Sequence, residues 1–225
     1  HIIQTNLKGA DTLDVCPMDK RLTPKQFEQM MADGATVIDV RDAAAFGGFH
    51  IPGSINIGFE KQLANWVGMV VDPTSEIVLV VADQEDYDRM VTELHRIGYD
   101  LIFGYLSGGI MAWLMSGRAV VQLEQTAPQQ LSARLSENGL RVIDVRTPSE
   151  WQNGHIAQAE HFPLTRILEG QYPQGPKDEE LVVHCGSGYR SNIAASLLPQ
   201  AGFSRVKSLA GGAFAWSNAG FALVP

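Results

Sequence analysis

An internal repeat restricts the folds open to this 225-residue chain more than any other feature of its sequence. Residues 37–41 read Val-Ile-Asp-Val-Arg, and the same five residues return at 142–146. Residues 107–113 and 210–216 form a second pair of similar segments, which both contain Gly-Gly and end in Ala-Trp. The two segments of this pair lie slightly closer together in the sequence than those of the first pair. A period of about 100 residues has the size of a small domain and exceeds that of solenoid repeats. The sequence therefore predicts two tandem domains of the same fold.

Each copy alternates short apolar runs with amphipathic segments, which is typical of α/β domains. In the first copy, we predict strands at 37–40, 77–81 and 101–106, and helices at 24–31, 87–97 and 109–115. In the second copy, we predict strands at 142–145, 181–184 and 206–209, and helices at 128–136, 191–198 and 212–219. Strands that alternate with helices form a mostly parallel sheet flanked by helices on both faces.

The repeat also predicts where the domains begin and end. We assign the first domain to residues 21–121 and the second to 127–225. Residues 1–20 then form an N-terminal extension, or a linker from a longer chain, since the sequence starts at His1 without a methionine. The segment 120–126 is the predicted linker between the two domains.

Composition excludes several classes of protein. The net charge is −8 and no block of basic residues occurs, which argues against nucleic acid as a partner. The sequence holds no apolar run of the roughly 20 residues that a membrane helix needs, and no secretory signal. Its six histidines show no close pairing, so we expect no metal and no cofactor.

The chain contains two cysteines, and only one of them lies in a motif. Cys16 stands beside Pro17 in the predicted N-terminal extension. A disulfide with Cys185 would occupy the thiol of the motif, so we expect a reducing cytoplasm as the location.

Cys185 follows a predicted buried strand and opens a glycine-rich segment that leads into a helix. Glycine lets successive backbone N–H groups turn toward one point, and a helix N-terminus adds partial positive charge there. Such surroundings favour the thiolate, the nucleophilic form of cysteine. A buried structural cysteine is the plain alternative, because free cysteine is among the most buried residue types. The combination of strand, cysteine, glycine loop, arginine and helix favours a nucleophile.

Loop length narrows the chemistry. Four residues separate Cys185 from Arg190, whereas cysteine phosphatases place five residues between nucleophile and arginine. The smaller ring of amides suits a single sulfur atom on the cysteine better than a tetrahedral oxyanion. In this loop the chain resembles the rhodanese (sulfurtransferase) family, whose catalytic cysteine carries sulfur as a persulfide.

The resemblance implies a role for each loop residue. Cys185 matches the nucleophile, and Arg190 either orients an anionic donor or ties the loop to a neighbouring carboxylate. His184 is interpreted as a strand-end residue. The substrate- or persulfide-binding loop is expected to comprise Gly186, Ser187, Gly188, Tyr189 and Ser191.

The implied reaction moves sulfane sulfur from thiosulfate or a low-molecular-weight persulfide to a thiol, sulfite or cyanide. The partners are therefore expected to be small sulfur-containing substrates. Two alternatives stay open: a small-oxyanion phosphatase or arsenate reductase, and a non-enzymatic sulfur-carrier or docking module.

The first copy provides an internal control. When strand 77–81 is aligned with 181–185, Val81 takes the place of the nucleophile. The residues that follow, 82–86, read Ala-Asp-Gln-Glu-Asp, without cysteine, glycine or arginine. These carboxylates either repel an anionic donor or simply cap the next helix. Under both interpretations the first domain is rhodanese-like and catalytically inactive.

Several residues recur in both copies and are therefore predicted to support the fold. Asp39 and Arg41 match Asp144 and Arg146, and His50 matches His155. Trp113 and Trp216 are interpreted as core anchors.

An inactive first and an active second domain resemble the C-terminal rhodanese pair of bacterial fusions with a metallo-β-lactamase-fold domain. The motifs that carry this resemblance are residues 53–57, 66–68 and 104–109. It implies a metallo-β-lactamase-fold domain elsewhere in the full-length chain, as a possible partner of this one.

Overall fold

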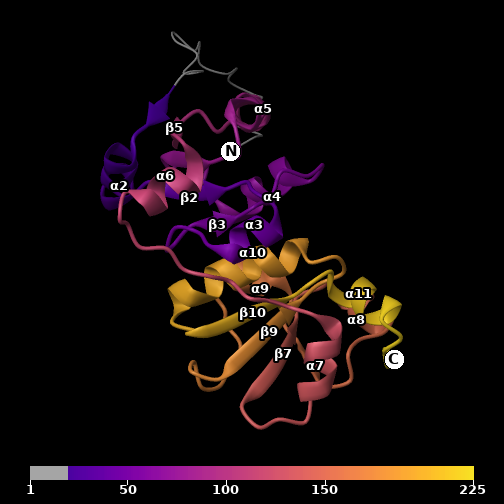
Figure 1. The fold of residues 1–225 in the computed structure, drawn as a ribbon. Helices are drawn as coiled ribbons and strands as arrows, with labels where there is room; N and C mark the ends of the chain where they lie inside the picture. The colour runs from indigo at the N-terminus through magenta and orange to yellow at the C-terminus, as the bar shows by residue number, and fades with distance from the viewer. Residues whose placement is uncertain (1–19) are drawn as a thin grey trace. The chain divides into compact units, whose positions relative to one another are not determined.

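The computed structural model describes residues 20–225, which form two compact units (Figure 1). One unit comprises residues up to Asp42 together with His50–Val120, and the other comprises Ala43–Phe49 together with Val121–Pro225. Cys16 and all but the last residue of the predicted extension 1–20 lie outside the described residues.

The first unit is built on a parallel sheet in which strands pair in the order β1-β5-β4-β2-β3. Its strands are β1 (Arg21–Leu22), β2 (Thr36–Asp39), β3 (Ile55–Asn56), β4 (Ile77–Val80) and β5 (Ile102–Leu106). Its helices are α2 (Pro24–Ala32), α4 (Leu63–Val70), α5 (Gln84–Arg96) and α6 (Gly109–Met115), while α3 (Ala43–Gly48) belongs to the other unit.

The second unit repeats this topology, with strands in the order β6-β10-β9-β7-β8 and every pairing parallel. Its strands are β6 (Gln125–Thr126), β7 (Leu140–Asp144), β8 (Ala159–His161), β9 (Glu180–His184) and β10 (Arg205–Leu209). Its helices are α7 (Pro128–Arg134), α8 (Pro148–Gln152), α9 (Leu164–Leu168), α10 (Tyr189–Leu197) and α11 (Gly212–Asn218), with a 3₁₀ turn η1 (Leu198–Ala201). The predicted fold class, two tandem α/β domains with parallel sheets flanked by helices, is confirmed.

All the predicted strands and helices are present. Several of their ends differ from the prediction by one or two residues, and three larger or more consequential differences concern the linker and the helices after β4 and β9. The predicted linker 120–126 was wrong at its end, because Gln125–Thr126 form edge strand β6. Helix α5 begins at Gln84 rather than residue 87, since the side chain of Asp83 caps it. Helix α10 begins at Tyr189 rather than residue 191, so Arg190 lies in its first turn.

The central strands form the cores because both their faces are covered. Every residue of Ile77–Val80 in β4 is fully buried, as are Leu181, Val182 and Val183 in β9. Trp113 and Trp216 are also buried, and each indole donates a hydrogen bond to a backbone carbonyl, of Ala119 and Ala222 respectively. The prediction that these tryptophans anchor the cores is confirmed.

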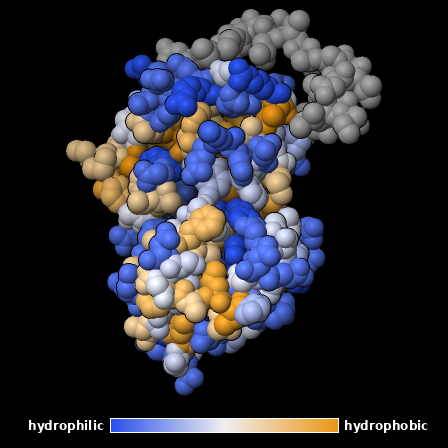
Figure 2. Space-filling model, turned by 90° about the vertical axis from the view of Figure 1, so that its right-hand side faces the viewer, coloured by the Kyte–Doolittle hydropathy of each residue, from blue (hydrophilic) through white to orange (hydrophobic). Residues whose placement is uncertain are grey.

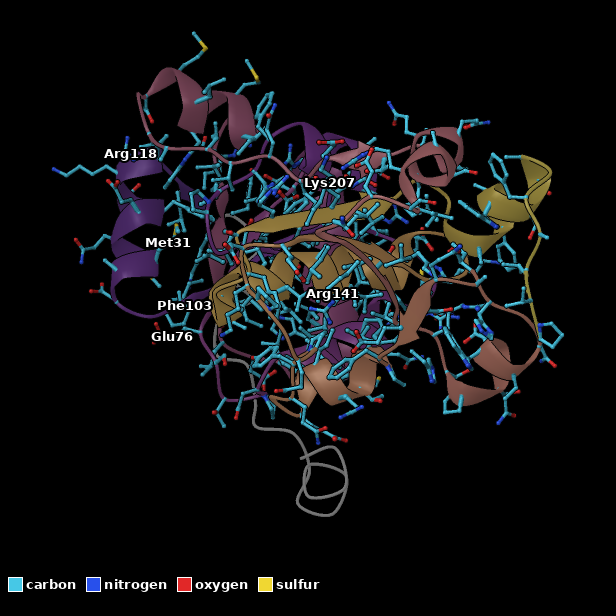
Figure 3. All side chains as sticks on the ribbon, turned by 90° about the horizontal axis from the view of Figure 1, so that it is seen from below. Met31, Glu76, Phe103, Arg118, Arg141 and Lys207 are labelled. Atoms are coloured by element: carbon cyan, nitrogen blue, oxygen red, sulfur yellow. The ribbon has the colours of Figure 1, made fainter. Side chains whose placement is uncertain are left out.

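A cluster of charges marks the amino end of the second sheet. Glu180, which begins β9 and is almost fully buried, accepts from Arg134 at 2.7 Å and lies 3.3 Å from the ammonium of Lys207 in β10, which Figure 3 labels. A buried carboxylate needs such partners to offset its desolvation. Ion pairs thus stabilise this end of the sheet.

Between residues 20 and 225, no helix is long and apolar enough to cross a membrane. The face seen in Figure 2 carries mostly hydrophilic residues, with smaller hydrophobic patches between them. In the same part of the chain, no group of three His, Cys, Asp or Glu side chains could hold a metal ion.

Candidate functional site

Cys185 follows the last residue of β9, at the carboxyl end of a central strand of the second sheet. Ligands of parallel α/β sheets bind at this end. The side chain is buried, with 1% of the residue exposed. Residues 185–188 form the short loop that joins β9 to α10, so the strand and the helix together fix the position of the thiol.

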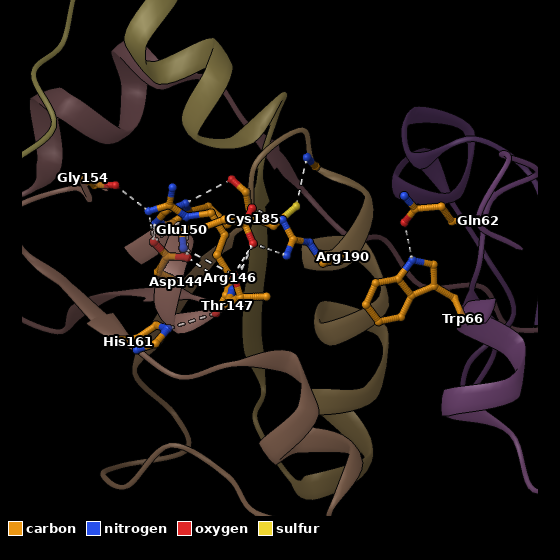
Figure 4. Close-up of polar contacts among 12 residues, drawn as sticks. Gln62, Trp66, Asp144, Arg146, Thr147, Glu150, Gly154, His161, Cys185 and Arg190 are labelled. Carbon is orange, nitrogen blue, oxygen red and sulfur yellow. Dashed lines mark hydrogen bonds and ion pairs between the residues drawn. The ribbon is translucent and has the colours of Figure 1, made fainter. Parts of the chain in front are cut away.

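The loop leaves the N-terminus of α10 open toward the sulfur. Gly188 occupies the N-cap position with φ +104°, a left-handed conformation that favours glycine, and no side chain caps the helix. Its N–H donates to Cys185 Sγ at 3.2 Å (Figure 4). The first N–H groups of a helix have no partners within the helix. The sulfur therefore lies where backbone donors and the helix dipole both stabilise negative charge.

Helix α11 holds the loop from its other side. The carbonyl of Cys185 accepts from Ala213 N–H at 2.8 Å, and that of Gly186 accepts from Phe214 N–H at 3.0 Å. Because a trans peptide directs its C=O and N–H in opposite directions, carbonyls bound to α11 turn their amides away from that helix. A Cβ on Gly212 would lie 2.4 Å from the Cys185 carbonyl, so only glycine permits this close approach.

Arg190 forms a bidentate ion pair with Glu150, at 2.7 and 2.5 Å (Figure 4). Hydrogen bonding to this guanidinium lowers the pKa of Glu150 to about 2. Hydrogen bonding to Glu150 in turn raises the pKa of Arg190, which also interacts with Cys185. Of the two roles predicted for Arg190, the structure shows the tether to a carboxylate.

Glu150, which contacts the loop from α8, was not predicted from the sequence. The backbone N–H and the hydroxyl of Thr147 donate to its carboxylate at 3.1 and 2.8 Å, in a capping box. The pattern Thr-x-x-Glu at 147–150 is the local signal that would have placed this side chain at a helix N-terminus. Its pairing with an arginine 40 residues away has no local signal.

The other predicted loop residues differ in where their side chains lie. Ser187 is exposed and Tyr189 is partly exposed, so both can border an entrance to the loop. Ser191 is buried, and its hydroxyl bonds the Gly188 carbonyl at 2.9 Å and the Ser208 hydroxyl at 3.0 Å. The Ser191 side chain thus braces the loop from inside the domain.

A second ion pair supports the strand beside the site. Arg146 holds both carboxylate oxygens of Asp144 and donates to the Gly154 carbonyl at 2.8 Å (Figure 4). The same pair exists in the first unit, where Arg41 binds both oxygens of Asp39. Because it is present in both units, this clamp serves the fold, as predicted.

His184 ends β9 and is completely buried, in agreement with its interpretation as a strand-end residue. Its Nε2 lies 3.5 Å from Asp144 and its Nδ1 3.4 Å from the Cys185 carbonyl. Burial lowers the pKa of this imidazole, which favours the neutral form. The ring therefore contacts the Asp144 clamp and the loop backbone.

The matching loop of the first unit is built differently. Only residues 81–83 separate β4 from α5, one residue fewer than in the second unit. The carboxylate of Asp83 accepts from Asp86 N–H at 3.0 Å and so closes the N-terminus of α5. Glu85 occupies the second helical position, where α10 has Arg190. Burial and then the Asp83 carboxylate raise the pKa of Asp86.

Comparison with known proteins agrees with this architecture. The family model for the rhodanese-like domain matches residues 23–116 and again residues 127–219. A sulfurtransferase of Allochromatium vinosum is 36% identical over 97 residues, which cover 43% of this chain and 90% of that protein. The thiosulfate sulfurtransferase GlpE of Pseudomonas paraeruginosa is 37% identical over 95 residues, covering 42% and 84%.

Some relatives are longer than the segment they share with this chain. Rhodanese-like domain-containing protein 15 of Arabidopsis thaliana is 30% identical over 109 residues, which cover 44% of this chain but 60% of that protein. Each of these three matches has the length of one domain. The two family matches together span most of the chain, which thus belongs to the rhodanese-like domain family and carries two copies of that domain.

Proposed function

We propose that the second domain is a sulfurtransferase in which Cys185 carries a sulfane sulfur as a persulfide. The observation that carries the proposal is the hydrogen bond from Gly188 N–H to Cys185 Sγ, at an uncapped helix N-terminus. Such a position stabilises an anionic sulfur, which is the form of both the attacking thiolate and the persulfide. Relatives named sulfurtransferases support the same reaction class.

In the first step, the thiolate of Cys185 attacks the outer sulfur of thiosulfate or of a low-molecular-weight persulfide. A bond forms between Sγ and that sulfur, and the donor's sulfur–sulfur bond breaks. Its electron pair leaves with sulfite or with a thiolate. The loop amides near the sulfur then hold the negative charge of the new persulfide.

In the second step, a nucleophilic acceptor, which is a thiol, sulfite or cyanide, attacks the outer sulfur of the persulfide. The bond between Sγ and this sulfur breaks, and its electron pair returns to Cys185 as thiolate. Electrons balance over the two steps without any redox cofactor. The guanidinium of Arg190 is already neutralised by Glu150, and it serves here to hold the loop in shape.

For the first domain we propose a non-catalytic role, since Val81 replaces the nucleophile and Asp83 closes the helix N-terminus. Because the chain resembles the rhodanese pair of bacterial fusion proteins, we also propose that the full-length chain contains a metallo-β-lactamase-fold domain. We further propose that the protein is located in a reducing cytoplasm.

Intact-protein mass spectrometry after incubation with thiosulfate tests the reaction. One added sulfur, about 32 Da, should appear on the wild type, should map to Cys185, and should be removed by cyanide or a thiol. The variant C185S is the matched control and should gain no mass. Absence of the adduct with thiosulfate and also with an alkyl persulfide would overturn the proposal.

A further inference from the structure

Phe214 places an exposed aromatic ring directly beside the sulfur-binding loop. It is 67% exposed, the highest value among the large hydrophobic side chains described for the second unit. Its own backbone N–H is bound to the Gly186 carbonyl at 3.0 Å, which fixes the backbone of Phe214 against the loop. Ligand sites are lined mostly by hydrophobic and aromatic side chains with a few polar groups.

The position of the ring follows from its contact with Gly186. A Cβ built on Gly186 would lie 3.5 Å from the edge of the Phe214 ring and 3.6 Å from a guanidinium nitrogen of Arg190. The ring and the guanidinium thus flank the residue that follows Cys185. Because Glu150 neutralises Arg190, the guanidinium beside Gly186 adds no net charge. Selectivity between acceptors then depends on apolar contact more than on charge.

We infer that Phe214 is a specificity-determining residue that packs against the carbon chain of an organic thiol acceptor. The inference rests on the proposed sulfur transfer and names one acceptor class for it. A thiol that attacks the persulfide brings its carbon chain close to the loop, and the exposed ring lies beside Gly186 in that loop. Sulfite and cyanide have no such chain and gain nothing from the ring.

A series of acceptors that differ only in carbon length tests this role. Cys185 is first loaded with sulfur from thiosulfate, and the rate of sulfur removal is then measured with ethanethiol, propanethiol and butanethiol. These thiols have closely similar pKa values, so nucleophilicity stays nearly constant along the series. Each buried methylene is worth up to about a fourfold increase in kcat/KM. In the wild type we expect a rise of about two- to fourfold per methylene.

Three variants complete the design. In F214S the dependence on chain length should nearly vanish through a higher KM, while rates with sulfite and cyanide stay within about twofold of the wild type. F214M should restore most of the dependence, because methionine keeps an apolar chain, as Met111 does at the matching position of the first unit. M111S is the matched control and should leave every rate unchanged.

The outcomes separate the two proposals. If Cys185 gains and releases sulfur but F214S keeps the chain-length dependence of the wild type, the role of Phe214 is contradicted and the proposed function stands. If the rate in the wild type does not depend on chain length, the role of Phe214 is likewise contradicted and the proposed function stands. If Cys185 gains no sulfur from any donor, both proposals are overturned.

Discussion

The loops after β4 and after β9 occupy equivalent places in their sheets, but a side chain caps the N-terminus of the following helix only after β4. After β4, Asp83 turns its carboxylate onto the N-terminus of α5 and satisfies a donor there. After β9, Gly188 has no side chain, and its N–H donates to Cys185 Sγ at 3.2 Å. The same strand order therefore supports a closed helix N-terminus in one unit and an open one in the other. The difference between the units lies in the helix cap and loop length as much as in the nucleophile.

Two further differences accompany this one. Arg190 and Glu150 form an ion pair in the second unit, and the equivalent positions in the first copy of the sequence repeat hold Glu85 and Ala45. Both members of the pair are thus replaced together. The Asp39–Arg41 and Asp144–Arg146 clamps, in contrast, are equally present in both units. Among these contacts, the helix cap and the Arg190–Glu150 pair differ between the two units, and the clamps do not.

Removing the nucleophile should have the largest effect. C185S is nearly isosteric, and we expect it to lower sulfur transfer by at least about 10³-fold while the protein stays folded. Steady-state transfer from thiosulfate to cyanide measures the loss, and circular dichroism checks the fold. Activity within tenfold of the wild type would mean that another residue, such as Cys16, is the nucleophile.

Removing the arginine should have the next largest effect. In R190A, the Glu150 carboxylate loses its partner beside the proposed site of an anionic sulfur. Hydrogen bonds to charged groups contribute about 1.5–3 kcal/mol, so we expect a loss of about 10- to 100-fold in sulfur transfer. The double variant R190A/E150A removes both charges and should recover part of this loss. If the double variant transferred sulfur more slowly than R190A, the role of charge balance would be contradicted.

The paired glycines should differ in their tolerance of a side chain. Gly109 and Gly212 both have positive φ, and such strain costs about 1–3 kcal/mol for alanine. In G109A the new Cβ would lie 3.6 Å from the nearest backbone oxygen, but in G212A it would lie 2.4 Å from the Cys185 carbonyl. We therefore expect G212A to destabilise its unit more and to reduce activity.

Hydrogen–deuterium exchange with peptide resolution measures both glycine variants, because it follows each sheet separately in one sample. Protection should fall further around β9 in G212A than around β4 in G109A. Equal losses of protection would show that the contact between α11 and the loop is unimportant.

The smallest effect concerns pH. The pKa of Glu150 is lowered from 4.5 to about 2 in the folded protein, so its ion pair adds stability above the unfolded value. This contribution is lost as pH falls from about 4.5 to about 2. Urea unfolding of the wild type and E150Q should differ most at neutral pH and converge toward pH 2. A difference that stays constant over this range would show that charge on Glu150 does not stabilise the fold.

Much of the fold could be predicted because the repeat and the hydrophobic periodicity are local signals. Buried strands such as β4 and β9 read as continuous apolar runs, and Thr23 with Pro24 signals the start of α2. The edge strand β6 was taken for linker, since two residues carry no periodicity.

The site could be predicted only in part, for a similar reason. Cys185, its glycines and Arg190 are adjacent in sequence, so their common role could be recognised from spacing. Glu150 and Phe214 come from α8 and α11 and reach the loop only after the chain has folded. Contacts between segments far apart in the sequence leave no pattern in a single chain.

The most direct test places a second thiol in the matching loop and lets both compete for one donor. The variant V81C, made in a C16S background, carries one thiol after β4 and the native Cys185 after β9. After brief exposure to thiosulfate, peptide mass spectrometry measures the added sulfur on each. We expect the adduct almost entirely on Cys185, because Asp83 closes the first helix N-terminus and nearby carboxylates repel the donor. Comparable labelling of both thiols would contradict the proposal that the construction of the loop makes only the second unit reactive toward the donor.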